Sequence, residues 1–315
     1  MSSSSSHAEP LVSVVIPTFN RRELVCRAID TALAQTHATV EIIVIDDGST
    51  DGTGESLRER YGDRIRYFAQ PNGGVSRARN HGMHLARGEF IALLDSDDQW
   101  LGDKLAKQVA FLQAHPGCSM VLTDVQRIDR QHRPIDVFRR RGVIRQDGDV
   151  LLQVLQNPSL VPSSALFRTS VFHQGVTFDE SLRTAEDVEF HLQVAVRFGI
   201  GVIEEPLTVA LRGHEALSDD PCSTVDYIRV MERFTGAHAD RIGPSQRRRA
   251  LFRTHERNCH SEFVSGQLLR GSRFWIGATT QVGSPGDVVA LARLATTFCR
   301  VLAVKLLRKL GLQRS

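Results

Sequence analysis

The sequence has few cysteines and lacks any long apolar run. Its five cysteines are scattered over 315 residues and form no C-x-x-C pair: Cys26, Cys118, Cys222, Cys259 and Cys299. An odd, scattered set argues against a disulfide framework or a zinc site and favours reduced thiols. No apolar run approaches the roughly 18 residues needed to span a bilayer. We therefore expect a cytoplasmic protein.

The N-terminus lacks the apolar core that a secretory signal requires. Its first seven residues are mostly serine, which gives a polar segment. We expect residues 1–10 to form a disordered tail.

Two glycine-rich phosphate-binding loops are also missing. A dinucleotide-binding domain needs a G-x-G-x-x-G turn directly after its first strand, so that the backbone can approach a pyrophosphate. Here residues 17–22, which follow the first expected strand, contain no glycine, and no G-x-x-x-x-G-K-[ST] loop occurs. The sequence thus excludes a dinucleotide dehydrogenase and a P-loop nucleotidase.

The composition is that of a globular protein with an uneven charge distribution. Hydrophobic residues make up 41% and charged residues 24% of the chain. From residue 226 to the end, sixteen Lys and Arg face six Asp and Glu, a balance of +10. The first 225 residues hold the other 23 basic and 30 acidic residues, a balance of −7. This split indicates an acidic, metal-using front part and a basic region suited to an anionic surface.

Apolar runs and amphipathic stretches alternate along the chain. Strands are expected at residues 11–16, 40–45, 65–68, 90–94, 119–125, 164–168 and 207–211, with helices between most of them. Pro17 is expected to end the first strand, and Asn20 to cap the next helix together with Glu23. Repeated strand–helix units of this size predict an α/β fold, a mostly parallel, Rossmann-like sheet flanked by helices.

Three of the expected strands end in polar clusters. The clusters are Pro17 to Asn20, Asp46-Asp47, and Asp95-Ser96-Asp97-Asp98. The carboxyl ends of parallel strands share one edge of a sheet, which is where open α/β sheets bind ligands. Three carboxylates within four positions repel one another, and a hard divalent metal would hold them together. A solvated turn after a strand is the alternative.

Four motifs in this region resemble those of the family 2 glycosyltransferases with the GT-A fold. They occur in that family's order over about 90 residues: residues 12–20, 45–51, 72–80 and 94–98. The resemblance implies an inverting transfer of a sugar from a nucleoside diphosphate-sugar, most often a UDP-sugar, assisted by Mn²⁺ or Mg²⁺. The acceptor would be a hydroxyl of a glycan or of a lipid-linked molecule.

The resemblance also implies roles for individual residues. Asp95 and Asp97 match the D-x-D motif that holds the metal and the diphosphate. The residues expected to contact the donor are Pro17, Thr18, Asn20, Glu23, Asp47, Arg79, Asp95, Ser96 and Arg212. Arg79 offers charge-assisted hydrogen bonds to phosphate, and its alternative is a solvated helix arginine.

A second acidic pair, Glu186-Asp187, precedes an amphipathic helix. It matches the family's E-D motif, whose Asp serves as the general base that removes a proton from the acceptor hydroxyl. The alternative is that acidic residues simply favour a helix N-terminus. His191, four positions on, lies among core-facing residues and is expected to pack there. We predict Asp187 as the catalytic residue.

A late segment, Arg212 to Ser218, resembles an R-x-H element of the same family. His214 would complete the metal shell or bind phosphate, with Arg212 and Ser218 assisting, and a lone surface histidine is the alternative. The predicted metal ligands are therefore Asp95, Asp97 and His214.

The remaining chain is expected to be helical and basic. We predict a tail over 1–10, a GT-A domain over 11–225 and a helical region over 226–315. Its last helix is amphipathic, so residues 287–315 contact a membrane surface, a partner or the catalytic domain. We expect no nucleic-acid partner. A non-catalytic nucleotide-sugar-binding or regulatory subunit on the same fold is the alternative function.

Overall fold

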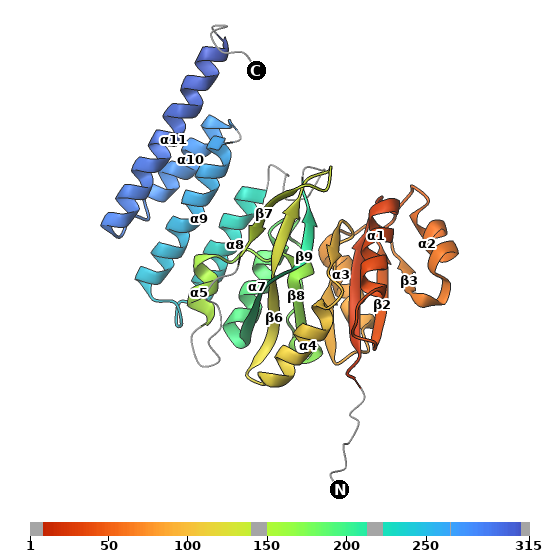
Figure 1. Cartoon of the computed structure of the whole chain (residues 1–315). Helices are drawn as coiled ribbons and strands as arrows, with labels where there is room; N and C mark the ends of the chain where they lie inside the picture. The colour runs from red at the N-terminus through yellow and green to blue at the C-terminus, as the bar shows by residue number, and fades with distance from the viewer. Residues whose placement is uncertain (1–8, 140–149, 213–222, 265, 310–315) are drawn as a thin grey trace. The chain divides into compact units, whose positions relative to one another are not determined.

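The computed structural model describes residues 9–139, 150–212, 223–264 and 266–309 (Figure 1). The chain divides into two compact units. Unit 1 comprises residues 1–154 and 158–219, and unit 2 comprises residues 155–157 and 220–315. The expected tail falls mostly on residues 1–8, which lie outside the described residues.

Unit 1 is built on a mixed sheet. The strand order is β3-β2-β1-β4-β8-β6-β9-β5, with β7 paired to β6. The strands are β1 Val12–Thr18, β2 Val40–Asp46, β3 Arg66–Ala69, β4 Phe90–Leu93, β5 Asp98–Trp100, β6 Cys118–Ile128, β7 Pro134–Phe138, β8 Ala165–Arg168 and β9 Gly199–Leu211. The first four are mutually parallel, as are β6 and β9. The predicted α/β fold is therefore confirmed, while β5, β7 and β8 add antiparallel pairings.

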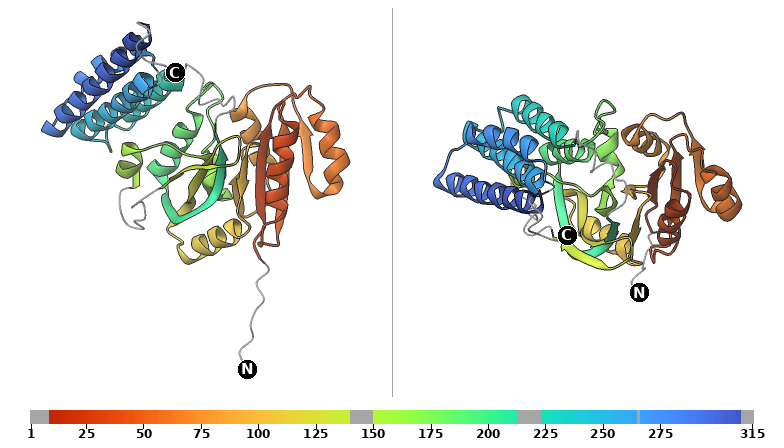
Figure 2. Two further views of the ribbon diagram at one scale, coloured as in Figure 1. Left: turned by 45° about the horizontal axis from the view of Figure 1, so that its top comes forward. Right: turned by 90° about the horizontal axis from the view of Figure 1, so that it is seen from above.

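Helices lie on both faces of the parallel strands. They are α1 Arg22–Leu33, α2 Thr53–Tyr61, α3 Val75–Leu85, α4 Lys104–Ala114, α5 Val150–Gln156, α6 Thr169–His173 and α7 Glu186–Arg197. Seen from above, α1 and α3 lie on opposite sides of the sheet (Figure 2). Successive side chains of a strand point to opposite faces of the sheet. Each buried strand therefore contributes side chains to the hydrophobic core on both faces.

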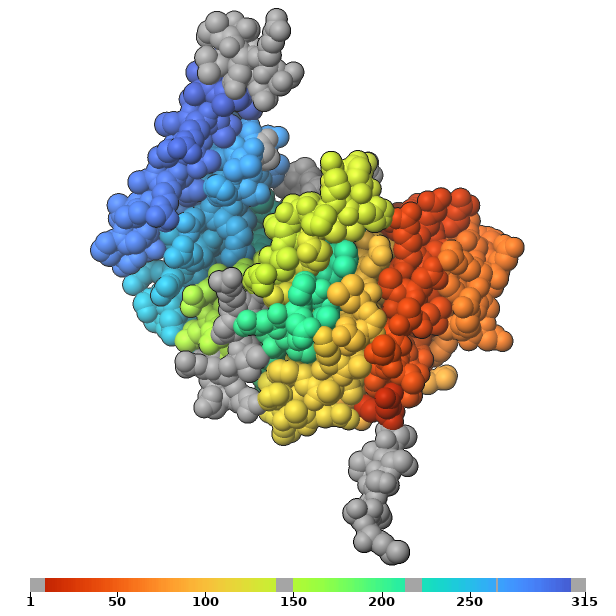
Figure 3. Space-filling model, viewed as in Figure 1, coloured from red at the N-terminus to blue at the C-terminus, as the bar shows by residue number. Residues whose placement is uncertain are grey.

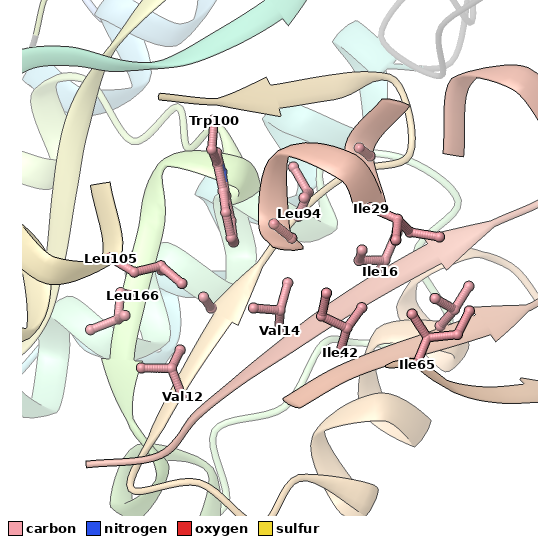
Figure 4. Packing of buried hydrophobic residues seen from close by; sticks show 14 of the residues in the cluster. Val12, Val14, Ile16, Ile29, Ile42, Ile65, Leu94, Trp100, Leu105 and Leu166 are labelled. Carbon is pink, nitrogen blue, oxygen red and sulfur yellow. The ribbon is translucent and has the colours of Figure 1, made fainter. Parts of the chain in front are cut away.

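The larger core cluster lies on the α1 face. There Val12, Val14 and Ile16 of β1 pack with Ile29 of α1 and Leu105 of α4 (Figure 4). On the other face, Ile43 and Ile45 of β2 pack against Ala78 of α3. Helix α7 shares that second face: Phe167, in register with Ile91, lies 5.6 Å from the Phe190 ring. The sheet is thus covered on both sides, as its continuous apolar strands require.

The first strand does not end at Pro17 as the sequence indicated. β1 continues to Thr18, and Pro17 stays in register with Ile45 of β2. On the other flank, β4 pairs with β1 only as far as Val15. Along a strand, successive backbone N–H groups point to opposite sides. The nitrogen of Pro17 points to the β4 side, where pairing has ended, so its missing N–H removes no hydrogen bond from the sheet.

The cap expected for the first helix is also wrong. Arg21, not Asn20, occupies the N-cap position of α1, and no side-chain cap bond forms there. Instead, the Arg22 N–H donates to Asp51 Oδ2 at 3.2 Å. The donor at the helix start is therefore satisfied by the loop after β2, which ties two neighbouring loops together.

Unit 2 is helical in its described part. It contains α8 Ser223–Ala237, α9 Pro244–Val264, α10 Leu268–Thr279 and α11 Pro285–Lys309. Phe252, Ala278 and Ala290 form one buried cluster, and Phe263 and Leu294 belong to a second. Over the ranges that the structure covers, no helix combines the length and hydropathy of a membrane span.

Candidate active site

The polar clusters lie where the strand order of the sheet reverses. The chain runs outwards from β1 through β2 to β3 and then returns to β4 on the other side of β1. Open α/β sheets bind their ligands beyond the carboxyl ends of the strands at such a point. The end of β1 and the loops after β2 and β4 carry Thr18, Asp47 and Asp95, so all three predicted clusters belong to this edge.

The acidic loop after β4 is fixed at both ends by the hydrophobic core. Leu94 is fully buried before it and Trp100 is 4% exposed after it (Figure 4). Between them, the Asp95 N–H donates to Ser163 Oγ at 3.0 Å, and the Ser163 hydroxyl donates to Asp98 Oδ2 at 2.5 Å. The Trp100 indole N–H donates to the Ser163 carbonyl at 2.7 Å. The carboxylates therefore sit on a rigid loop held by the segment before β8.

Two arginines compensate the first two acids of this loop. Arg21 Nη1 lies 2.8 Å from Asp97 Oδ2, and Arg79 Nη2 lies 2.7 Å from Asp95 Oδ1. Asp97 keeps 13% of its side chain exposed and Asp95 keeps 23%, so both remain accessible to a ligand.

The third acid, Asp98, has a strongly perturbed pKa. Burial raises the pKa of this carboxyl well above its ordinary range, and the charges of Asp97 and Asp95 raise it further. The hydrogen bond from Ser163 and the charge of Arg212 act in the opposite direction. The charges of Asp95 and Asp97 thus destabilise the ionised form of Asp98.

This repulsion is the basis for testing whether the loop fits a divalent metal. Asp95 and Asp97 offer hard oxygen ligands, and a divalent cation would lower the electrostatic cost of their proximity to Asp98. Among the described residues, however, no three His, Cys, Asp or Glu side chains form a ready metal-binding group. His214, the third predicted ligand, lies outside the described residues, as does Ser218. The oxygen donors present fit a Mg²⁺ or Mn²⁺ ion.

Arg79 bridges the acidic loop to the helix that begins with the second acidic pair. Its side chain is 4% exposed, and its Nη1 lies 2.8 Å from Glu186 Oε1 while Nη2 contacts Asp95. The guanidinium also lies over the Phe178 ring, 5.0 Å from the ring centre. The two carboxylates raise the pKa of Arg79 despite its burial. The solvated-arginine interpretation of Arg79 does not hold.

Asp187 follows Glu186 at the start of α7. The preceding residue, Ala185, has a left-handed φ of +62°, which turns the chain sharply into the helix. Dense surroundings raise the pKa of the partly exposed Asp187 to about 7, and the neighbouring charge of Glu186 contributes. The charge of Asp95 also acts on it, so Asp187 lies within electrostatic reach of the acidic loop. A carboxylate with this pKa is suited to accept a proton near neutral pH.

His191, on the same helix, is packed as expected. It is 1% exposed, and its Nδ1 lies 3.0 Å from the Pro158 carbonyl. It therefore belongs to the core of this region rather than to a metal pair with the acids.

Asp47 organises the loop before α3. Its Oδ1 accepts from Gln70 Nε2 at 2.8 Å and from the Gly73 N–H at 2.9 Å, and its Oδ2 accepts from the Gly74 N–H at 2.8 Å. Gly74 has a φ of +89°, which favours glycine at this position. Three donors leave about one of the four acceptor sites of the carboxylate for a ligand.

The other predicted donor residues lie on the loop after β1 or close to it. Asn20, with a φ of +50°, accepts from the Thr50 N–H at 2.8 Å and donates its own N–H to Ser49 Oγ at 2.8 Å. Pro17 is buried, and Glu23 is exposed in the first turn of α1. These contacts join the loops after β1 and β2 into one surface.

Two buried hydroxyls near this edge have no hydrogen-bond partner among the residues that are described. They are Thr18 Oγ1, at the end of β1, and Ser76 Oγ, in the first turn of α3. Because an unpaired buried hydroxyl is costly, such atoms point to a polar ligand or to water.

Ser96 and Arg212 also lie near the acidic loop. Ser96 is buried within it, and its hydroxyl lies 3.5 Å from Arg21 Nη1. Arg212 follows β9 and donates its N–H to the Ile128 carbonyl at 2.8 Å. Its charge affects the pKa of Asp98, so the guanidinium is near the three acids.

Sequence reasoning missed two residues that shape this site. Arg21 directly follows the Pro17–Asn20 cluster. Its position in the sequence could therefore have indicated that it lies at the same edge of the sheet, near Asp97. Ser163 contacts Asp95 and Asp98 across 68 and 65 positions, and no local pattern could have paired it with them.

Comparison with known proteins agrees with this architecture. The family model described as Glycosyl transferase family 2 matches residues 13–175, more than half of the chain. The succinoglycan biosynthesis protein ExoO of Rhizobium meliloti is 32% identical over 193 residues, which cover 56% of this chain and 53% of ExoO. In the same way, the chain spans less than two thirds of the length of the other curated relatives.

Two solved structures share the fold. S. aureus TarS 1–349 in complex with UDP-GlcNAc has a TM-score of 0.67 at 21% identity, covering 96% of this chain and 93% of that one. The mannosyltransferase PcManGT of Pyrobaculum calidifontis, in complex with GDP-Man and Mn²⁺, has a TM-score of 0.55 at 19% identity, covering 96% and 87%. The family match extends from β1 past β8 and so includes the acidic loop. The chain belongs to glycosyl transferase family 2.

Proposed function

We propose that this protein is an inverting glycosyltransferase that uses a nucleoside diphosphate-sugar and a divalent metal. The observation that carries the proposal is the Arg79 bridge, in which one guanidinium contacts Asp95 at 2.7 Å and Glu186 at 2.8 Å. It links the acids suited to the donor side to the residue next to Asp187. An inverting transfer needs the residues that hold the donor and the general base to lie around the same reacting carbon.

Asp187 acts as the general base. The acceptor hydroxyl oxygen forms a bond to the anomeric carbon while the bond from that carbon to the diphosphate breaks. The proton of the hydroxyl passes to Asp187, and the nucleoside diphosphate leaves with the bonding electron pair. A single base suffices, because no carboxylate has to form a covalent intermediate as in double displacement.

Asp95 and Asp97 would hold Mn²⁺ or Mg²⁺ together with the diphosphate. When bound, the metal supplies Lewis-acid stabilisation of the negative charge that develops on the leaving group. Arg79 and Ser163 orient Asp95, and Arg21 orients Asp97. Arg79 acts on the donor through Asp95, in addition to the phosphate contact predicted for it. His214 would complete the metal shell or contact phosphate.

The donor base and ribose bind over the loops after β1 and β2. Asp47 has about one free acceptor site for the base, and the unpartnered Thr18 hydroxyl is available to the nucleoside. Pro17, Asn20, Glu23, Ser96 and Arg212 complete the donor contacts. We favour a UDP-sugar, with support from the UDP-GlcNAc complex of TarS, although PcManGT binds GDP-Man.

The acceptor is a hydroxyl of a glycan or of a lipid-linked molecule. ExoO is named for the biosynthesis of a polysaccharide, which supports this acceptor class. Work on such an acceptor would take place at the cytoplasmic face of a membrane.

A non-catalytic nucleotide-sugar-binding subunit on the same fold is the second candidate. Such a subunit would bind the donor without turnover. It would therefore need neither a general base nor a carboxyl with a raised pKa. The presence of Asp187 beside the bridged acids favours the enzyme.

The Asp187→Asn variant tests the base assignment. It keeps the size of the side chain but cannot accept the proton, so sugar transfer with Mn²⁺ should fall by about 10²- to 10⁴-fold. Donor affinity should stay near that of the wild type. Asp63→Asn, an exposed carboxylate away from the site, is the control. Transfer by Asp187→Asn at the wild-type rate would refute the assignment, and donor binding without turnover in the wild type would favour the non-catalytic subunit.

A further inference from the structure

Unit 2 contains a groove between α9 and α11. Its volume is about 430 Å³, and eight residues line it: Arg253, Glu256, Arg257, His260, Ala290, Arg293, Leu294 and Thr297. Ala290 and Leu294 are buried in the helical core, so the floor is apolar. The groove lies wholly within one unit and is separate from the candidate active site.

The rim of this groove is basic. Three arginines and one histidine stand against one acid, Glu256. Glu256 is already engaged by Arg253, with Nη1 to Oε2 at 2.8 Å. Arg257 donates to the Tyr227 hydroxyl at 2.5 Å. The exposed Arg293 side chain faces the rim from α11. The net positive charge of the rim is complementary to an anion.

An exposed aliphatic side chain lies beside two arginines on the same side of α11. At 3.6 residues per turn, Val289, Arg293 and Arg300 fall within about 40° of one another around the helix. Val289 is 53% exposed. Helix α11 lies against α9 and α10, and one side of it is exposed (Figure 3). A face that combines arginines with exposed aliphatic side chains is typical of helices that lie in a membrane interface.

Helix α10 has the same surface character. Leu269 and Ile276 are 87% and 67% exposed, and Arg273 lies on the same face of the helix. Large aliphatic side chains at this exposure are unfavourable in water unless a surface covers them. Two helices of the unit therefore combine exposed apolar groups with basic residues.

We propose that unit 2 binds the surface of a membrane rich in anionic phospholipid, with a lipid phosphate in the α9–α11 groove. Arg253, Arg257 and Arg293 contact the phosphate, while Val289, one turn before Arg293, enters the acyl boundary. The charge balance of +10 over residues 226–315 provides long-range attraction to the same surface. This site is independent of the proposed transfer reaction, and it would stand if that reaction were different.

Flotation of the full-length protein with lipid vesicles tests the proposal. We expect binding to phosphatidylcholine vesicles that contain phosphatidylglycerol, and little binding to phosphatidylcholine alone. Binding should weaken as salt rises, because charge attraction is screened. An Arg253→Gln/Arg293→Gln variant should partition about 30-fold more weakly, because each basic residue near the surface contributes about fivefold.

The matched control removes the same charge elsewhere. Arg130→Gln/Arg229→Gln replaces two exposed arginines that do not line the groove and should bind like the wild type. A Val289→Asn variant, which leaves the charge unchanged, should also bind more weakly. Circular dichroism checks that each variant is folded.

Three results would overturn the proposal. The first is equal binding of the wild type to neutral and anionic vesicles. The second is thermal stabilisation by inorganic phosphate with no vesicle binding, which would assign the groove to a soluble phosphate compound. The third is concentration-dependent self-association in place of vesicle binding, which would assign the face to a second copy of the chain.

Discussion

A guanidinium held between two carboxylates is difficult to replace. Arg79 is buried, and its planar fork reaches Asp95 and Glu186 at the same time. A lysine carries the same charge, but its side chain is shorter and ends in a single ammonium group, which cannot reach both carboxylates in the same way. The geometry therefore depends on arginine itself and not only on positive charge.

We predict that Arg79→Lys destabilises the protein by about 3–5 kcal/mol, because at least one buried acid loses its partner. Urea unfolding monitored by circular dichroism measures this loss. Arg77→Lys, an exposed neighbour on the same helix, should change stability by less than about 0.5 kcal/mol. Equal stability of the two variants would show that the bridge contributes little.

The raised pKa of Asp187 predicts a pH dependence. A base must be deprotonated, so the transfer rate should rise with pH, with a midpoint near 7, and level off about one pH unit higher. Glu186→Gln removes a like charge next to Asp187 and should move this midpoint to lower pH. Initial rates from pH 5 to 9 measure both profiles. A rate that stays level down to pH 5 in the wild type would contradict the raised pKa.

The same shift has an opposite effect on stability. Because the folded state favours the protonated form of Asp187, the stability contributed by this group is greatest at low pH. It decreases as pH rises from the ordinary value near 4 to about 7. Activity and the contribution of this side chain to stability thus change in opposite directions across this interval.

At the scale of elements, all seven expected strands were found, while β5 and β7 were not predicted. The strands at 40–46 and 90–93 are mostly apolar, and the expected ranges differ from them by one residue. β5 is only three residues long and contains Asp98, which pairs with Ala210 of β9. A local pattern cannot reveal such a strand, because its hydrogen-bond partner lies more than a hundred residues away.

The roles of polar side chains showed the same division. Asp47 and Asp95 were identified from their positions after strands. Asn20 was expected to cap a helix, because a cap pattern is recognised from neighbouring residues alone. In the structure its side-chain oxygen instead accepts from the Thr50 N–H in the loop after β2. The ion pair of Arg79 with Glu186 was not predicted, because the two residues are 107 positions apart.

The contact between α3 and the sheet depends on one glycine. A Cβ on Gly82 would lie 2.3 Å from Val15 Cγ1 of β1. We predict that Gly82→Ala destabilises the protein by about 1–3 kcal/mol through overpacking. Since α3 carries Arg79, transfer activity should fall as well.

Chemical denaturation of Gly82→Ala measures the loss. The control is Gly102→Ala, whose added Cβ would meet only the Ala34 carbonyl at 3.6 Å. A stable, fully active Gly82→Ala variant would show that α3 can shift without disturbing the bridge.

At the scale of the whole molecule, donor and metal should stabilise the fold together. A ligand that binds only the folded state at 100 times its dissociation constant adds about 2.7 kcal/mol. We predict that a UDP-sugar with Mn²⁺ raises the melting temperature and that EDTA abolishes most of the increase.

Thermal scans with UDP-, GDP- and dTDP-sugars measure this effect and identify the nucleotide. Asp97→Asn should lose the metal-dependent part of the shift. If EDTA left the shift unchanged in the wild type, the metal would have no part in donor binding.

The Arg79–Glu186 bridge also bears on how the protein forms. The two residues are 107 positions apart, and Ser163 is 68 positions from Asp95. Contacts between residues this far apart form slowly, because the chain between them loses conformational entropy before the contact can offset that loss. During synthesis, β1 to β4 can pair while Arg79 and Asp95 still lack Ser163 and Glu186. On the proposed mechanism, the reaction centre is therefore complete only after most of unit 1 has left the ribosome. A chain that stops before residue 186 has Asp95 and Asp97 but lacks the proposed base, Asp187.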